Sequence, residues 1–262
     1  MRQHTLHLER QYKDRTTYWD SRMESRLKTT LSSGMQTISA IVDGLDHSKM
    51  RWPRSFACNS KEWGQFVRPN LDLTACIIHG HAVMLTATWP WVEKAASLNI
   101  DICAHALSHV AAAGTDTRNC QFLLQADNTS RESKNNPTLR WMGFMVGASI
   151  LRRCELRCLS TGHSHEDVDQ YFSCVSNHIQ SKKEIPSPQR FVETLEEFME
   201  NRQIRPYEPH REVNLVTSVR DWKHGPSMRP DRPAKEELFT SMGHGKSPSG
   251  SGRSRSSARL CV

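Results

Sequence analysis

The 262-residue chain is 37% hydrophobic with a mean hydropathy of −0.63, which fits one substantial domain with polar extensions and excludes a protein made mainly of membrane spans. The formal charge of +7 is uneven, because residues 223–262 carry eight Lys or Arg against three Asp or Glu, a net of +5. Such a basic tail favours a polyanionic partner such as nucleic acid, although a solubilising tail has the same composition.

The first expected element is an N-terminal helical segment, residues 1–34, with a thin apolar stripe among many charges. It either packs on the core or is the remnant of a DNA-binding region. A strand is expected over residues 36–43, and a hairpin of strands 71–78 and 82–88 turns at His79-Gly80-His81. For these two histidines a role in the turn is the simplest interpretation.

Helices and strands alternate in the middle of the chain, in the order helix, strand, helix, strand, helix. The expected ranges are 91–113, 121–127, 136–150, 154–160 and 165–182. Ser164 can cap the last of these helices, with Asp167 as its capping-box partner. Glu166 and Asp167 also suit the positive end of the helix dipole, so a structural role is expected for both.

Pro186 and Pro188 interrupt the chain before a helix over 189–202. Residues 213–222 are a short expected strand, so residues 183–223 form a C-terminal helix and extension. From residue 224 to 262 Gly, Ser, Pro, Lys and Arg dominate, and such a segment buries too little apolar surface to order itself. We therefore expect a basic disordered tail.

The order of elements predicts an α/β domain over residues 35–182. Three antiparallel strands followed by helix–strand units make a mixed five-stranded sheet with helices on its faces. This order is similar to the ribonuclease-H-like fold, in which metal-binding acids lie at the ends of the first and fourth strands and on the last helix.

Three aspartates fall on those positions. Asp43 and Asp127 each end a predicted apolar strand, and Asp169 lies near the start of the last core helix, on one face with His165. Together they could hold two divalent metal ions that clamp the attacking and leaving oxygens of a phosphoryl transfer. The alternatives are a turn before Gly44 for Asp43 and an Asx turn for Asp127; Asp46 is a reserve candidate for the first acid.

Three motifs carry a resemblance to a known group of proteins. They are Asp43-Gly44-Leu45-Asp46-His47-Ser48-Lys49, Asp127-Asn128 with Asn135, and Gly162-His163-Ser164-His165-Glu166-Asp167-Val168-Asp169. They resemble a family of transposon-derived domains of unknown function that is related to the DDE/D transposases and integrases. The resemblance implies metal-dependent cleavage and strand transfer on DNA, with Asp43, Asp127 and Asp169 as catalytic metal ligands and Mg²⁺ or Mn²⁺ as the cofactor.

Two features depart from that family and keep an alternative open. Many of its members have glutamate at the third acidic position, where this chain has Asp169, and no obvious zinc finger or helix-turn-helix precedes the core. The alternative is a catalytically inactive, domesticated module that binds nucleic acid. In either case the expected partner is nucleic acid, DNA by the resemblance, and a homo-oligomer is an open option.

Several polar residues near the acids could contact the nucleic acid. Arg131, Lys134 and Arg140 form a basic rim, or simply the solvated start of a helix. Asn135, His163 and His165 are further candidates, and the two histidines could also bind metal. They end a Gly-His-x-His motif that metallophosphoesterases share, but the other motifs of that class are missing from the sequence.

The eight cysteines include no Cys-x-x-Cys pair, and most lie in apolar runs. We expect buried free thiols of a reducing compartment. Cys154 and Cys158 share a strand face, but a zinc site there would need two more ligands. The N-terminus lacks an apolar signal segment, and the apolar stretch 141–151 is too short to cross a bilayer. The expected protein is nuclear or cytoplasmic, neither secreted nor transmembrane.

Overall fold

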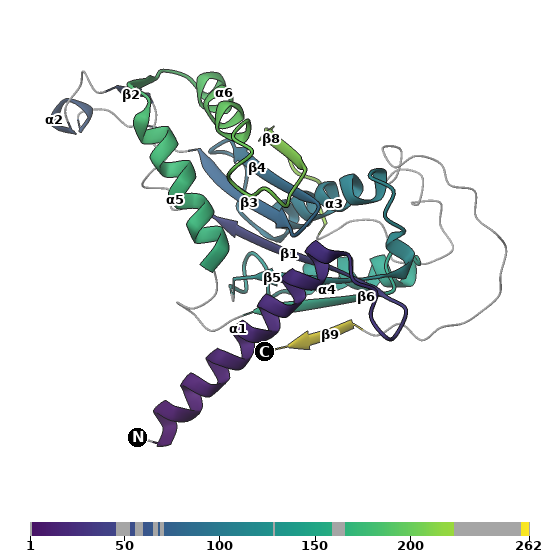
Figure 1. The fold of residues 1–262 in the computed structure, drawn as a ribbon. Coiled ribbons are helices and arrows are strands. Elements are labelled where there is room, and N and C mark those ends of the chain that lie inside the picture. Colours follow the sequence, from purple (N-terminus) through teal and green to yellow (C-terminus); the bar gives the residue numbers. More distant parts are fainter. Residues whose placement is uncertain are drawn as a thin grey trace.

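The structure is a computed structural model that describes residues 2–45, 53–55, 60–64, 68, 71–127, 129–158, 166–222 and 258–261. Its centre is a mixed β-sheet with helices on both faces (Figure 1). Among the described helices, none combines the length and the apolar composition that a bilayer crossing requires.

Seven strands form the main sheet in the order β8-β4-β3-β1-β5-β6-β9. They are β1 (Gln36–Gly44), β3 (Asp72–Ile78), β4 (Ala82–Thr88), β5 (Cys120–Ala126), β6 (Arg153–Cys158), β8 (His210–Val216) and β9 (Ala258–Cys261). β1, β3 and β4 pair antiparallel, whereas β5 and β6 continue parallel to β1 and β8 runs parallel to β4. The expected mixed α/β sheet is confirmed, with β8 and β9 as additional strands at its two edges.

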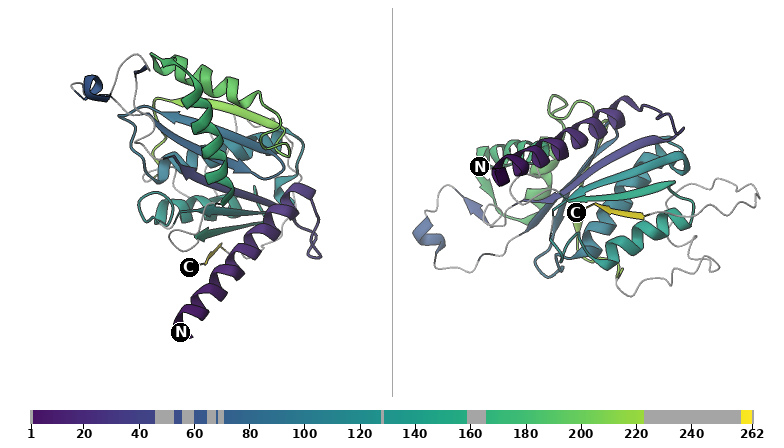
Figure 2. Two further views of the ribbon diagram at one scale, coloured as in Figure 1. Left: turned by 60° about the vertical axis from the view of Figure 1, so that its left-hand side comes forward. Right: turned by 90° about the horizontal axis from the view of Figure 1, so that it is seen from below.

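Two helices cover each face of this sheet, and a long N-terminal helix lies across one of the two faces. α3 (Ala96–Ala112) and α4 (Asn136–Gly147) pack on one face, and α5 (Glu166–Ser181) and α6 (Pro188–Met199) on the other. α1 (Arg2–Leu27) shares the face of α5, on the opposite side of the sheet from α4 (Figure 2). A one-turn helix, α2 (Ser60–Trp63), and a two-stranded sheet of β2 (Arg54–Ser55) and β7 (Glu184–Ile185) complete the fold.

The apolar pattern of the sequence explains the two faces of the sheet. Along β1, Ile38, Ala40 and Val42 belong to the core beneath α3 and α4, whereas Ile41 belongs to the core beneath α5, as expected from the alternation of side chains in a strand. The predicted stripe of α5 is also confirmed, because Val168, Phe172, Val175 and Ile179 are all buried.

The starts of two helices are capped by side chains, and the described cysteines in the core are free thiols. Asn135 caps α4 and Ser187 caps α6, each accepting a backbone N–H, and each is followed by a proline within the first two helical positions. Cys76, Cys103, Cys120 and Cys154 are buried free thiols, as expected. Burial raises the pKa of Cys154 to about 12, so this thiol stays protonated at neutral pH.

Two boundaries differ from the sequence expectation. The helix predicted from residue 91 begins at Ala96, because Trp89 N–H donates to the Val216 carbonyl and the Trp91 indole donates to the Thr217 carbonyl, which ties the preceding segment to the end of β8. The last strand lies at 210–216 instead of 213–222, since pairing with β4 sets its register.

The tail also holds one element where none was expected. Ala258–Cys261 forms β9, which pairs in parallel with β6 at the sheet edge. The composition of the tail predicted disorder because few of its residues can bury apolar surface. Pairing with an edge strand instead uses backbone N–H and C=O groups, which almost any sequence can supply.

Candidate functional site

The sheet brings two of the three predicted metal ligands together. β1 and β5 are parallel neighbours, and Val42 pairs with Ala126, so Asp43 and Asp127 occupy the next position on each strand at the carboxyl edge. Neighbouring strands lie about 4.8 Å apart. The two aspartates therefore come from neighbouring backbone positions, and their joint metal binding stays a prediction.

The third predicted acid has a different environment. Asp169 lies on the exposed side of α5, while the opposite side packs on the sheet. Its carbonyl accepts a hydrogen bond from Ser173 Oγ at 3.0 Å. Asp43 and Asp127 thus follow paired residues of neighbouring strands, whereas Asp169 lies on the outer face of a helix. Asp46, His163 and His165 lie outside the described residues.

Basic side chains surround the carboxyl edge. A Cβ atom added to Gly44 would lie 2.6 Å from Lys94 Nζ, so this ammonium group lies against the backbone beside Asp43. Arg131 is exposed and lies 3.7 Å from a Glu93 carboxylate oxygen, and Arg140 is exposed on α4. Lys134 and Asp127 both lie close enough to Cys158 to act on its pKa, which burial raises. Lys94, which sequence reasoning missed, is thus a further basic group beside Asp43, and the role of the basic rim stays a prediction.

Asn135, expected at the nucleic-acid interface, has a structural task. Its Oδ1 accepts the Thr138 N–H at 3.0 Å, and its Nδ2 donates to the Ser130 carbonyl at 3.1 Å. Both polar ends of the amide are thus engaged in capping α4 and closing the turn before it.

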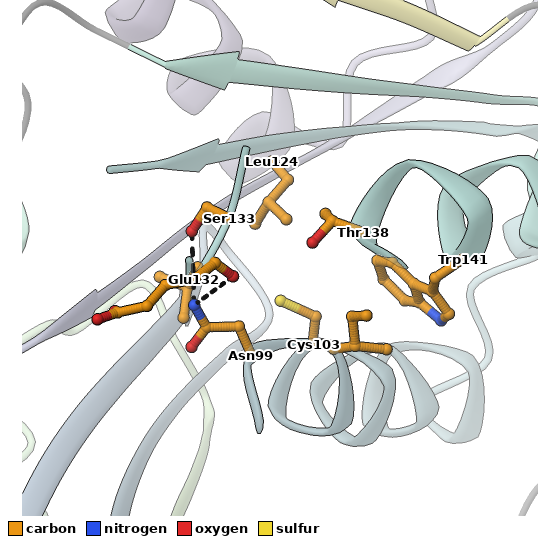
Figure 3. A pocket seen from close by; sticks show the side chains of 9 residues that line it. Asn99, Cys103, Leu124, Glu132, Ser133, Thr138 and Trp141 are labelled. Carbon is orange, nitrogen blue, oxygen red and sulfur yellow. Dashed lines mark hydrogen bonds between the residues drawn. The ribbon is translucent and has the colours of Figure 1, made fainter. Parts of the chain in front are cut away.

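A hydrogen bond from α3 holds that turn in place (Figure 3). Asn99 Nδ2 donates to the Glu132 carbonyl at 3.2 Å, beside a small cavity that Cys103, Leu124 and Trp141 help to line. The volume of about 10 Å³ suits a single water molecule at most. This cavity, beside the turn after β5, is therefore too small for a substrate.

The buried carboxylate of α5 is Asp167, which lies among polar groups from distant parts of the chain. Tyr18 Oη donates to Asp167 Oδ1 at 2.6 Å, and His79 Nε2 and Arg205 both lie 3.0 Å from Oδ2. Burial alone would raise the pKa of Asp167, but hydrogen bonding to His79, together with the Arg205 charge, holds it well below its usual range.

His79, the partner of Asp167, is fully buried. Burial lowers the pKa of His79, against the opposing effect of Asp167. Its Nε2 lies 3.0 Å from Asp167 Oδ2, and its Nδ1 lies 3.0 Å from the Ser39 carbonyl oxygen and 3.2 Å from Ser39 Oγ. The sequence assigned His79 to a turn and Asp167 to a helix cap, so their pairing is a finding of the tertiary structure.

Glu208 completes this buried polar cluster, which comprises Tyr18, His79, Asp167, Arg205 and Glu208. Its carboxylate has no exposed surface, accepts the Gly80 N–H at 3.2 Å, and lies 3.4 Å from Arg26. The cluster joins α1, the β3–β4 turn, the start of α5 and the segment after α6. Because its groups bond mainly to one another, we assign it to fold stability.

A second group of titratable residues lies on the surface between α3 and β8. It comprises His105 and His109 of α3 with His210 and Glu212 of β8, and we call it the His/Glu cluster. One donor atom each from His105, His109 and Glu212 lies within 4.8 Å of the others. The signals in the sequence are the His-x-x-x-His and His-x-Glu spacings, which are too common to single out alone.

Comparison with known proteins gives one relationship. No curated protein and no solved structure matches the chain. Residues 65–239 match the model of DUF7869, a domain of unknown function, and this range is more than half of the chain. It contains Asp127, Asp169 and the whole His/Glu cluster, whereas Asp43 precedes it. The chain therefore belongs to the DUF7869 family of domains of unknown function.

Proposed function

We propose that this domain binds nucleic acid and cleaves or transfers phosphodiester bonds with Mg²⁺ or Mn²⁺ held at the carboxyl edge of β1 and β5. The observation that carries the proposal is the adjacency of Asp43 and Asp127, one position beyond the Val42–Ala126 pair. Acids at the carboxyl ends of neighbouring parallel strands are a common location for function in α/β folds.

The strand order supports the same proposal. The segment β4-β3-β1-β5-β6, antiparallel on one side of β1 and parallel on the other, has the arrangement of the ribonuclease-H-like fold, to which we attribute the domain. The transposase relationship is part of this proposal, and it would make Asp169 the third acid. The exposed position of Asp169 makes its contribution the least supported of the three.

Charges and polar groups near the pair fit a phosphate-containing substrate. Lys94 and Arg131 can contact the nucleic-acid backbone, which positions a duplex without reading its sequence. Gln125, paired with Ile41, is 2% exposed, and within the described structure both polar atoms of its amide lack a hydrogen-bond partner. A buried amide of this kind is costly unless a further group completes its bonding.

The chemistry divides between metal and protein. A bound divalent pair supplies Lewis acidity to the attacking and leaving oxygens. Asp43 and Asp127 would hold the ions through carboxylate oxygens, which Mg²⁺ prefers. The basic rim would hold the phosphate backbone in line with them.

Nicking of supercoiled DNA and binding to a labelled duplex test the proposal. With Mg²⁺ or Mn²⁺ the protein should nick DNA, and Asp43→Asn and Asp127→Asn should each abolish nicking while binding is kept or strengthened, because one charge that repels phosphate is removed. Asp116→Asn is the matched control: this exposed aspartate precedes β5 and pairs with Arg118, so its loss should leave nicking intact.

Three other results of these assays would change the proposal. Binding without cleavage on duplex, hairpin and single-stranded substrates would replace the enzyme with the inactive nucleic-acid-binding module. Cleavage that survives Asp127→Asn would place the active site elsewhere. Retained cleavage in Asp169→Ala would reduce the proposed triad to the pair.

A further inference from the structure

The His/Glu cluster is built by two regular elements that face each other. His105 and His109 are one turn apart on α3, so both lie on one face of the helix. His210 and Glu212 are two residues apart on β8, so both lie on one face of that strand. Glu212 pairs in register with Met84 of β4, which belongs to the core beneath α3, so α3 covers the face of the sheet that carries Glu212.

The donor atoms converge on one point. Glu212 Oε1 lies 3.0 Å from His105 Nε2, and Glu212 Oε2 lies 2.8 Å from His109 Nε2. The two imidazole nitrogens are 3.4 Å apart. In a tetrahedral zinc site with bonds of 2.0–2.1 Å, neighbouring ligand atoms are separated by roughly 3.3 Å, so the spacing of these nitrogens already matches one edge of the tetrahedron.

His210 lies directly beside these three residues. Its Nε2 is 3.1 Å from Glu212 Oε2, and its ring stacks on that of His109 with centroids 3.8 Å apart. His210 therefore fixes both the carboxylate and one imidazole in their present orientation. Groups that orient ligands in this way commonly change metal affinity by about 10–100-fold.

We propose that His105, His109 and Glu212 bind a divalent transition-metal ion, Zn²⁺ in the first instance, with His210 as a positioning residue. Two imidazoles and one carboxylate are a known zinc-binding combination, with the fourth position left to water. The site would fasten the edge strand β8 to α3. It does not depend on the proposed nuclease, because β8 is the outermost strand, beyond β4 and β3 from β1, and the cluster lies at the amino end of β8, whereas Asp43 and Asp127 lie at carboxyl ends.

Each ligand atom of the cluster already lies within hydrogen-bonding distance of a neighbour. A network of hydrogen bonds around Glu212 without metal is the competing explanation, and it predicts no specific metal binding.

Metal titration of the full chain, purified without a histidine tag and treated with EDTA, distinguishes the two explanations. Zn²⁺ binding is measured by competition with a chromophoric chelator. The wild-type protein should bind one equivalent at this site; His105→Ala, His109→Ala and Glu212→Gln should each weaken that binding by about 100-fold, and His210→Ala by about 10-fold. His178→Ala removes an imidazole from α5, outside the cluster, and should leave binding unchanged.

Two further measurements distinguish loss of the metal site from misfolding and from metal binding by cysteine. Circular dichroism should show the same fold in all variants, since His105 is half-exposed, and EDTA should lower the Tm of the wild type but not that of His109→Ala. Co²⁺ should give a visible spectrum without thiolate charge-transfer bands, as expected for nitrogen and oxygen ligands. Unchanged affinity in His109→Ala, or a thiolate band from a residue such as Cys174, would overturn the proposal.

Discussion

Asp167 and Asp169 lie two residues apart on α5 and have opposite environments. Asp167 is 5% exposed and bonded to Tyr18 and His79, whereas Asp169 is on the exposed side of the helix. The sequence favoured Asp169 as the functional residue, because only its position relative to the apolar stripe could be read. At the scale of single residues, burial depends on partners that lie far away in the sequence.

The two aspartates make a matched pair for a stability measurement. Asp167→Asn should lower the free energy of unfolding by about 3 kcal/mol, because it removes the charge that compensates the nearby Arg205. Asp169→Asn should change it by less than about 0.5 kcal/mol. Urea unfolding followed by circular dichroism gives both values, and equal losses would contradict the assigned environments.

Gly80 and Gly114 form a second matched pair. Both have positive φ angles, +76° and +90°, so alanine at either position costs about 1–2 kcal/mol. At Gly80 the new Cβ would also lie 2.6 Å from Arg26 Cα, whereas nothing lies within 4 Å at Gly114.

Gly80→Ala should therefore destabilise the protein more than Gly114→Ala, because α1 would have to move away from the β3–β4 turn. Thermal unfolding of both variants measures the difference. A smaller loss at Gly80 would mean that α1 does not pack closely there.

At the scale of elements, α1 has two parts with different roles. Its C-terminal half is tied to the sheet, since Ser25 Oγ donates to the His79 carbonyl at 2.7 Å and accepts the Ser39 N–H at 3.1 Å. Its N-terminal half extends beyond the sheet (Figure 1), and Tyr12 is 70% exposed there. Packing on the core, one of the two roles expected from the sequence, is thus found for the C-terminal half.

Two truncations separate these parts. Deleting residues 1–12 should leave the unfolding midpoint nearly unchanged, because the first buried side chain along α1 among those described is Tyr18. Deleting residues 1–27 should strongly destabilise the fold, since it uncovers His79 and Glu208, which have no exposed surface. If the longer truncation has the stability of the shorter one, α1 is not part of the folded unit.

At the scale of the whole molecule, buried histidines link stability to pH. Burial lowers the pKa of His79, and burial followed by the Lys28 charge lowers that of His81 to about 4, against about 6.5 in an unfolded chain. Below pH 6.5 the unfolded chain therefore binds protons that the native state does not. This contribution to stability is present above pH 6.5 and is lost as the pH falls toward 4.

The urea midpoint should accordingly decrease from pH 7.5 to pH 5.0. His81→Asn should show a weaker decrease, because it removes one of the groups that titrate in this range. A midpoint independent of pH over this interval would show that these histidines titrate equally in the folded and unfolded protein.

Much of the fold was encoded in local patterns that the sequence displays directly. The alternation in residues 36–44, the apolar runs of the β3–β4 hairpin and the period of α5 predicted strands and helices near their observed positions. The carboxyl ends of parallel strands meet at the same edge of a sheet, and so Asp43 and Asp127 could be expected at one edge from the sequence.

Contacts between distant segments were decided by the tertiary structure alone. The pairing of His79 with Asp167 and the convergence of His105 and His109 on Glu212 join residues separated by 88 to 107 positions. Local sequence patterns do not predict such contacts. The sequence by itself determined the α/β class and most of the helices and strands, because backbone periodicity and chain order are local. Which polar side chains became buried partners depended on how helices packed across the sheet, because burial and electrostatic pairing are properties of the assembled core.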